Sequence, residues 1–285
     1  MDGCFLYTES RHCDNINNMN IRLTPLFSSS SGNSYLISAG ETNILVDAGV
    51  TGAQLTSALE EVSVDPHSLN GIIVTHEHVD HIKGVGVMSR KFDIPVYANA
   101  LTWEQMEDKI GKISLKNQRV VDRTDFFIKD LCIMPFSVSH DAADPVGYSV
   151  GSANNRVSIL TDTGKVTEKM LDAIEGSSLV VLEANHDLEM LRNGPYPYAL
   201  KQRIMSNKGH LSNMTAAGTA LELYKRGVRG LILGHISSHN NKKILAFRTV
   251  AGFCEKQGIE VNKDLFIISA NRTSVTGTFK VGADQ

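Results

Sequence analysis

Residues 76–81 read HEHVDH and directly follow a mostly apolar run, Gly71–Thr75. Such a run is typical of a buried strand, and the spacing of apolar residues after the motif is typical of a helix. The motif therefore lies where a strand ends and a helix begins. Three imidazoles and a carboxylate this close together cannot all be buried core groups, because each needs a polar partner. Side chains of these types at this spacing are typical of a metal site.

The backbone geometry divides the motif between two ions. In an extended chain His76 and His78 project to the same side, so both can contact one metal. Asp80 and His81 lie in the turn into the helix and can face a second metal. Glu77 points away from both, and we do not expect it to be a ligand.

Three more side chains of metal-binding type come shortly after predicted strands: His140, Asp162 and His235. A single histidine is more often structural, but three such residues at the carboxyl ends of strands favour a shared site. The seven candidate ligands of the sequence exceed what one tetrahedral ion can use, so we predict two divalent metal ions. Imidazoles and carboxylates suit zinc, manganese or iron, and of these we expect zinc.

The hydrophobic pattern alternates short strands with helices, without an internal repeat or a low-complexity linker. We predict an α/β fold in which two sheets pack face to face with helices outside, as a single domain over residues 19–285. The predicted strands are Ile21–Phe27, Tyr35–Ser38, Asn43–Asp47, Gly71–Thr75, a short strand around Val96, Phe126–Ile128, Leu131–Phe136, Val146–Val150, Val157–Leu160, Leu179–Leu182, Leu231–Leu233 and Leu265–Ile268. The predicted helices are Ala53–Val62, Ile82–Phe92, Trp103–Ile110, Met170–Ile174, Met214–Lys225 and Ile244–Lys256.

The HEHVDH motif followed in order by His140, Asp162 and His235 resembles the metallo-β-lactamase superfamily. The resemblance covers the chain from about Met19 to the end and implies a four-layer αββα sandwich. It also implies how the ligands are shared between the ions. One metal is then held by His76, His78 and His140, the other by Asp80, His81 and His235, and Asp162 bridges the two.

Five further segments are similar to the YycJ/WalJ subgroup of this superfamily: FSSSSGNS, SHDAADPVGY, LEANHDLEML, GPYPYALKQRI and GHLSN. The subgroup is assigned a 5′→3′ exonuclease activity on double-stranded DNA. The stretch from GHLSN to LGHIS is also similar to the end of ribonuclease Z, where a histidine before a helix, here His210, assists the leaving group. We take His210 and Asp80 as the catalytic residues, Asp80 in addition to its role as a ligand.

Positive charge is concentrated in one part of the chain. The net charge is −3, yet the segment from Arg192 to Arg248 holds ten Lys or Arg residues and one acidic residue, Glu222. Charge runs are usually solvated surface. Two candidate site histidines lie in this segment, however, which favours an anionic substrate. We expect Lys201 and Arg203 to bind nucleic acid, DNA in particular, through its phosphates.

The turn Ser28–Ser31, with Gly32 and Asn33, is either a plain hairpin turn or a cradle for a phosphate near the metals. Both interpretations stay open, and Ser31 and Asn33 are candidate substrate contacts.

Other polar side chains also allow two interpretations. His186 and Asp187 either line the pocket or cap the next helix, and we favour the second. Tyr196 and Tyr198 either stack on a base or belong to a Pro/Tyr-rich loop that packs on its own domain. We assign His239 to the start of a helix, and His12 and His67 to the surface.

The N-terminal residues 1–18 are polar and lack the basic start, apolar centre and cleavage site of a secretory signal. We expect them to form an extension outside the fold. No apolar run reaches the roughly 18 residues needed to cross a bilayer, so we expect no membrane association. Four cysteines without a C-x-x-C spacing argue against a disulfide framework and fit a reducing, cytoplasmic setting.

These observations predict a dinuclear-metal hydrolase that cleaves phosphodiester bonds of nucleic acid, as a DNA exonuclease. Two alternatives stay open. A glyoxalase II-like hydrolase of a small thioester or lactone needs the same metals but not the basic segment. A metal-bearing nucleic-acid-binding module without turnover is the other, and the complete set of ligands argues against it.

Overall fold

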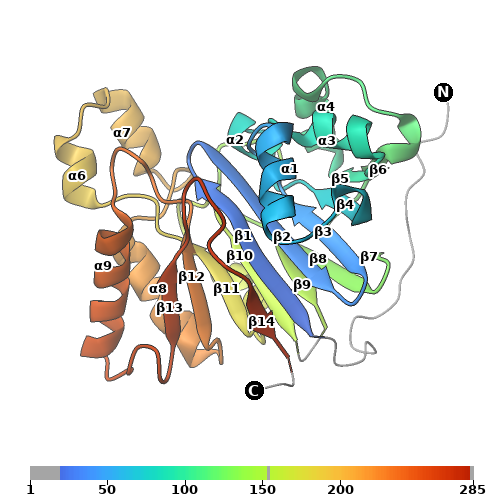
Figure 1. Ribbon diagram of the computed structural model, residues 1–285. Coiled ribbons are helices and arrows are strands. Elements are labelled where there is room, and N and C mark those ends of the chain that lie inside the picture. Colours follow the sequence, from blue (N-terminus) through green and yellow to red (C-terminus); the bar gives the residue numbers. More distant parts are fainter. Residues whose placement is uncertain (1–19, 153–154, 283–285) are drawn as a thin grey trace.

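Two sheets lie face to face and helices cover both outer faces in the computed structural model, which describes residues 20–152 and 155–282 (Figure 1). This is the predicted four-layer αββα arrangement. The predicted N-terminal extension, residues 1–18, lies outside the described residues. In the part of the chain that the structure describes, no helix is long and apolar enough to span a membrane.

The first sheet has the strand order β14-β1-β2-β3-β4-β5-β6. Strands β3 to β6 run parallel to one another, so their carboxyl ends meet at one edge. The strands of this sheet are β1 (Ile21–Ser29), β2 (Gly32–Ala39), β3 (Thr42–Val46), β4 (Leu69–Ile73), β5 (Val96–Ala98), β6 (Gln118–Val120) and β14 (Phe279–Val281).

The second sheet has the strand order β13-β12-β11-β10-β9-β8-β7. Strands β10 to β13 are parallel, and β7 to β10 are joined antiparallel. The strands of this sheet are β7 (Phe126–Ile128), β8 (Leu131–Ser137), β9 (Val146–Gly151), β10 (Arg156–Leu160), β11 (Leu179–Glu183), β12 (Gly230–Gly234) and β13 (Phe266–Ser269).

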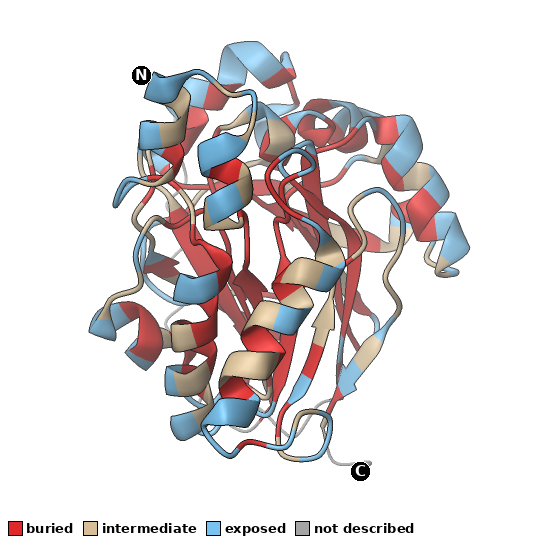
Figure 2. Ribbon diagram, turned by 90° about the vertical axis from the view of Figure 1, so that its left-hand side faces the viewer, coloured by how far each residue is buried: buried red, intermediate tan, exposed pale blue. Residues whose placement is uncertain are grey.

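Apolar side chains fill three layers. The layer between the sheets includes the fully buried Tyr35, Ile37 and Ile159. A second layer joins α1, α3 and α4 to the first sheet, and a third joins α5, α8 and α9 to the second sheet. The strands are buried almost throughout, whereas the outer helices expose one side (Figure 2). The helices are α1 (Gly52–Glu61), α2 (Val79–Ile82), α3 (Val85–Phe92), α4 (Ala100–Ile110), α5 (Glu168–Ile174), α6 (Leu188–Asn193), α7 (Tyr198–Ile204), α8 (Asn213–Lys225) and α9 (Lys243–Lys256), with 3-10 turns at Pro66–Ser68 and Leu115–Asn117.

The predicted strands and helices are confirmed to within a few residues at their ends, with one exception. The helix predicted over Ile82–Phe92 is two helices, α2 and α3, separated at Gly84. A Cβ on Gly84 would lie 2.4 Å from the carbonyl oxygen of Val50, so the chain bends here to pass the loop after β3.

Three described strands and helices were not predicted, β6, β14 and α7, and α6 was expected only as the helix that Asp187 would cap, without bounds. The strands have three residues each, and the helices have six and seven, too few to show a clear hydrophobic period. The interpretation of GPYPYAL as a loop was therefore wrong from Tyr198 onward, where α7 begins. Figure 1 shows α6 and α7 beside each other, beyond the ends of the strands of the second sheet.

Candidate metal centre

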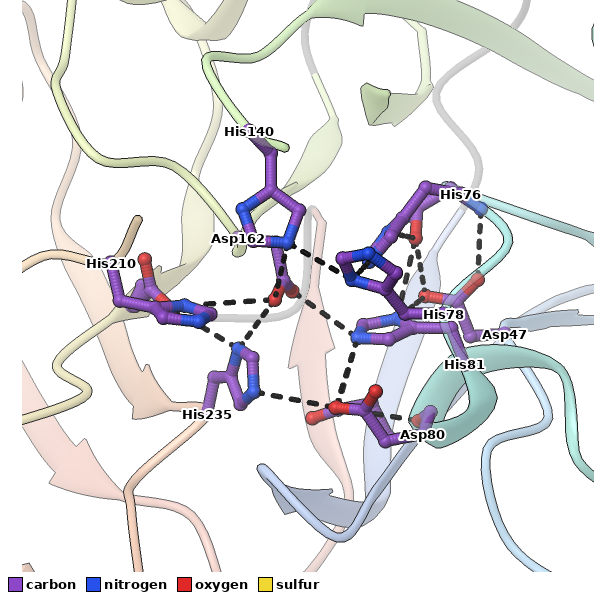
Figure 3. A network of polar contacts seen from close by, with 12 residues as sticks. Asp47, His76, His78, Asp80, His81, His140, Asp162, His210 and His235 are labelled. Atoms are coloured by element: carbon purple, nitrogen blue, oxygen red, sulfur yellow. Dashed lines mark hydrogen bonds and ion pairs between the residues drawn. The ribbon is translucent and has the colours of Figure 1, made fainter. Parts of the chain in front are cut away.

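The seven candidate ligands converge from five places in the chain (Figure 3). His76 and His78 follow β4, and α2 carries Asp80 and His81. The remaining three follow strands β8, β10 and β12 of the second sheet, and they are His140, Asp162 and His235. The site thus lies where the carboxyl ends of strands from both sheets meet, as predicted.

His76, His78 and His140, here called the first triad, point their ring nitrogens at one another. Nδ1 of His78 lies 3.1 Å from Nε2 of His76 and 3.2 Å from Nε2 of His140. Nδ1 of His140 faces the carbonyl oxygen of Gly209 at 3.2 Å, which fixes the ring and leaves Nε2 for the site.

Asp80, His81 and His235, the second triad, lie side by side with the first. Oδ2 of Asp80 is 3.6 Å from Nε2 of His81 and 3.6 Å from Nε2 of His235. Both imidazoles are almost fully buried, while a quarter of the Asp80 side chain is exposed. The open side of this triad is therefore the carboxylate.

Asp162 lies between the triads. Its Oδ2 is 3.3 Å from Nε2 of His81, and its Oδ1 is 3.0 Å from Nδ1 of His235. Oδ1 is also 3.8 Å from Nε2 of His140, which belongs to the first triad. A carboxylate in this position can contact ions held by both triads.

The donor atoms fit a divalent metal. Within each of several groups of three or four residues the ligand atoms lie within 4.8 Å of one another. Nε2 of His235 and Oδ2 of Asp162 are buried and make no hydrogen bond. Buried polar atoms that make no hydrogen bond are costly, and a bound cation satisfies such lone pairs. The His/Asp cluster is thus of a kind that binds divalent metal.

The imidazoles and carboxylates of the site shift one another's pKa values. Burial lowers the pKa of His81, but the carboxylates of Asp162, Asp47 and Asp80 outweigh burial and raise this pKa to about 9. Burial also opposes ionisation of Asp162, yet His235 and His81 hold its pKa well below the usual range. The carboxylate is therefore ionised, and metal binding must displace protons from the imidazoles.

Two buried carboxylates behind the ligands were missed from the sequence. Asp47 follows β3, and Oδ2 accepts a hydrogen bond from Nδ1 of His81 at 2.7 Å. Glu183 ends β11, and Oε1 lies 2.8 Å from Nδ1 of His210 and 3.1 Å from Nδ1 of His235. Both residues come at the carboxyl end of a strand, the same pattern that identified His140, and this pattern could have found them.

Three of these residues have a left-handed backbone. The φ angles are 61° at Asp47, 56° at Asp162 and 49° at His235. Each lies one or two residues after a strand, and Figure 3 shows its side chain at the site. Asp and His tolerate positive φ better than most residues.

An open pocket of about 370 Å³ lies over both triads. Tyr196, Leu200, Arg203 and Ile204, in or just before α7, form one of its walls. His210 also lines the pocket, with about a fifth of its side chain exposed. The structure thus brings His210 and Arg203 to the same pocket.

The other three predicted substrate contacts, Asn33, Ser31 and Lys201, do not line the pocket. Asn33 is fully buried beneath the second triad, with Nδ2 3.1 Å from Nε2 of His81, so a substrate cannot reach it. Ser31 is exposed in the hairpin turn between β1 and β2 but does not line the pocket, whereas its neighbour Ser30 does. Lys201 lies on the other side of α7 and donates to the carbonyl of Arg192.

The basic segment from Arg192 to Arg248 does not place all of its cations around the site. Helix α8 begins beside the site and carries the chain about 20 Å away from it. Arg226 and Arg229 therefore lie at the far end. Arg226 is neutralised there by three carboxylates, those of Glu168, Asp172 and Glu175.

The remaining open interpretations are decided by position. Asp187 caps α6, as favoured, and His186 is buried without lining the pocket. Tyr196 lines the pocket, while Tyr198 is 77% exposed and faces away from it. His239 does not start a helix, because α9 begins four residues later; its Nδ1 lies 3.2 Å from the Tyr196 hydroxyl.

Of the surface histidines, His67 is exposed as predicted. His12 lies outside the described residues. Glu77 is not directed at the metal cluster: its Oε1 accepts a hydrogen bond from the backbone N–H of Ala143.

Comparisons with known proteins show the family of the chain. A family model described as a beta-lactamase superfamily domain matches residues 42–236. The chain is 39% identical to exodeoxyribonuclease YycJ of Bacillus anthracis over 246 residues, which cover 86% of this chain and 93% of that protein. It is 38% identical to exodeoxyribonuclease WalJ of Streptococcus pneumoniae over 255 residues, with 88% and 94% covered. The chain therefore belongs to the beta-lactamase superfamily and, within it, to the family of YycJ and WalJ.

The fold is shared with solved structures of low sequence identity. The metallo-beta-lactamase fold protein YhfI from Bacillus subtilis superposes with a TM-score of 0.69 at 16% identity. The superposition covers 92% of this chain and 99% of that one.

Proposed function

We propose that this protein is a metal-dependent hydrolase that cleaves phosphodiester bonds of DNA as an exonuclease. One observation carries the proposal: both triads, the carboxylate between them and a partly exposed imidazole, His210, line or underlie one open pocket. Relatives that match over more than nine tenths of their own length are named exodeoxyribonucleases, which supports the choice of DNA.

Two ions are the simplest use of the seven ligands. The first triad would hold one, the second triad the other, and Asp162 would contact both. Zinc is the metal we expect, since imidazole and carboxylate ligands suit it. When bound, two such ions supply Lewis acidity to phosphoryl oxygens and lower the pKa of water.

The protein's own groups then position the substrate and move a proton. Glu183 accepts a hydrogen bond from Nδ1 of His210, which orients the ring and leaves Nε2 for the pocket. Burial opposes the charge of Glu183, but His210 outweighs burial and lowers the pKa of Glu183 to about 2, so this carboxylate stays ionised. We assign His210 as the general acid that protonates the leaving oxygen. Asp80 lines the pocket together with His78, His140, Asp162 and His235, and of the second triad it has the most exposed side chain, within reach of the reacting atoms.

A small-ester hydrolase is the competing function, because the metal site alone would serve both reactions. Arg203 at the wall of the pocket favours an anionic substrate. The cytoplasmic setting stays a prediction from the cysteines.

A panel of substrates tests the proposal. Metal-loaded protein is incubated with linear duplex DNA, single-stranded DNA, closed circular DNA, RNA, a small phosphodiester and a thioester. We expect linear DNA to be shortened from an end, circular DNA to stay intact, and Asp162→Asn to abolish turnover. Asparagine keeps the left-handed backbone of position 162 accessible. Turnover of the thioester without degradation of any DNA would contradict the proposal.

A further inference from the structure

Arg203 lies on the face of α7 that borders the pocket. Leu200, Arg203 and Ile204 follow the three- and four-residue spacing of one helix face, and all three line the pocket. Among the described residues that line it, Arg203 is the one Lys or Arg. It is therefore the cation that the polypeptide itself presents to a substrate there.

The guanidinium is held from one side by Asp141. Nε of Arg203 donates a hydrogen bond to Oδ2 of Asp141. The second carboxylate oxygen, Oδ1, is buried, makes no hydrogen bond and lies 3.5 Å from Nε2 of His140. Asp141 thus lies between Arg203 and His140 of the first triad, and it holds the guanidinium close to this triad.

This contact leaves the outer edge of the guanidinium free. Within residues 20–152 and 155–282, neither Nη1 nor Nη2 of Arg203 has a hydrogen-bond partner. The side chain is 57% exposed. A guanidinium anchored through Nε presents its two terminal nitrogens together, and this arrangement matches two oxygens of a phosphate. A lysine carries the charge but cannot make both contacts in one plane.

We propose that Arg203, positioned by Asp141, binds a substrate phosphate next to the one that is cleaved. The inference rests on the proposed function and adds a subsite to it. The group recognised is a phosphate oxyanion. It comes either from a phosphomonoester at the end of the strand or from the neighbouring phosphodiester.

The competing interpretation is that Arg203 and Asp141 form an exposed ion pair with no role in substrate binding. Exposed pairs of this kind contribute little to stability, and they do not change the choice of substrate. The two interpretations predict different effects on kcat/KM when one phosphate is removed from the substrate.

The experiment compares three variants on matched duplexes. Arg203→Lys keeps the charge and removes the paired donors, and Asp141→Asn weakens the anchor. Arg248→Lys, at an exposed position of α9, is the matched control. One duplex carries a terminal 5′-phosphate and a second ends in a hydroxyl. A third carries a neutral methylphosphonate at the linkage beside the first cleaved bond. Bound metal is measured for each variant, so that only proteins with wild-type metal content are compared.

On the duplex with a terminal 5′-phosphate, which keeps every phosphate, we expect Arg203→Lys to lower kcat/KM by about 10- to 100-fold. This is the effect of losing hydrogen bonds to a charged group. The loss should appear mainly in KM, and Asp141→Asn should show a smaller loss of the same kind. Removing the phosphate that Arg203 binds should lower kcat/KM of the wild type by a similar factor. The same change to the substrate should not lower kcat/KM of Arg203→Lys any further. The duplex that shows this non-additivity identifies the source of the phosphate.

Equal losses for Arg203→Lys on all three duplexes, or wild-type kcat/KM for this variant, would overturn the subsite. A wild-type protein that degrades none of the duplexes would instead contradict the proposed function.

Discussion

Oδ2 of Asp47 accepts a hydrogen bond from Nδ1 of His81 at 2.7 Å, and neither side chain is exposed to solvent. The same carboxylate accepts two more hydrogen bonds from Thr75, one from its backbone N–H and one from its hydroxyl. These contacts hold the ring of His81 so that its Nε2 faces the carboxylates of Asp80 and Asp162. Asp47 thereby orients a ligand without contacting the pocket.

Asp47→Asn should weaken metal binding by about 10- to 100-fold, as changes behind a ligating histidine commonly do. The amide turns one acceptor into a donor that faces the donors of Thr75 and His81. Competition with a fluorescent zinc chelator measures the affinity. Asp93→Asn is the control, because Asp93 has a similar φ of 57° but is exposed on another part of the surface. Equal zinc affinity in the two variants would show that Asp47 does not orient His81.

His210→Gln should keep the metal content of the wild type and lower kcat by about 10²- to 10⁴-fold, the range for a lost general acid. Glu183→Gln should also lower kcat, and the double variant should lose little more than His210→Gln, because the two residues act as a unit. Mass spectrometry of the native protein gives the metal content. His210 contacts the Asp162, Glu183 and His235 group closely enough to be a ligand. Loss of metal in the His210 variant would assign it that role instead.

Gly49→Ala should destabilise the fold and the second triad together. A Cβ at this position would lie 1.7 Å from the carbonyl oxygen of Asp80, so the backbone of α2 must move. We expect a loss of about 3 kcal/mol in unfolding free energy, together with weaker metal binding. Gly218→Ala in α8 is the matched control, since its Cβ would meet nothing within 4 Å. In a helix interior this substitution should stabilise by about 1 kcal/mol. Denaturant titrations of both variants, with chelator present, give the comparison; similar free energies would contradict the close approach at Gly49.

The stability of the metal-free protein should fall between pH 6.5 and pH 4 in part because of His186. Burial lowers the pKa of this histidine to about 4, and its Nδ1 has no hydrogen-bond partner. The unfolded chain, with a histidine pKa near 6.5, takes up this proton more readily than the folded chain. The stabilisation is therefore complete above pH 6.5 and is lost as the pH falls toward 4. Linkage makes the loss roughly 3 kcal/mol.

His186→Gln removes the titrating group, so its unfolding free energy should depend less on pH in this window. The control is His67→Gln, which removes an exposed histidine. Urea titrations at several pH values, in the presence of chelator, give the three curves. A wild-type slope in His186→Gln would show that His186 does not titrate abnormally.

The candidate ligands could be identified from the sequence because their chemistry is local. HEHVDH combines donors that no apolar core accepts, and His140, Asp162 and His235 each follow a strand whose apolar run is readable. The αββα layers were predicted from a resemblance together with the alternation of strands and helices. Helix α7, YALKQRI, escaped because it directly follows the Gly/Pro-rich GPYP, which favoured a loop over the whole stretch.

Positions that depend on distant contacts were not predictable in this way. Asn33 looked like a substrate contact because its Gly/Ser-rich surroundings suggest a phosphate loop. The hairpin instead places it under His81, 48 positions along the chain. The charge of Arg226 counted toward a basic face until α5 supplied its partners. Both outcomes depend on the register between strands and on the packing of helices. Neither the register nor the packing can be predicted from the local sequence.

The left-handed backbone at Asp47, Asp162 and His235 also limits how this site can change over generations. Few residue types enter that conformation at low cost, chiefly Gly, Asn, Asp and His. A mutation to a bulky or β-branched residue there would damage folding as well as chemistry. Relatives that lost their metals yet kept the fold should therefore carry asparagine or glycine at these three positions, so an inactive descendant would be recognisable from its sequence alone.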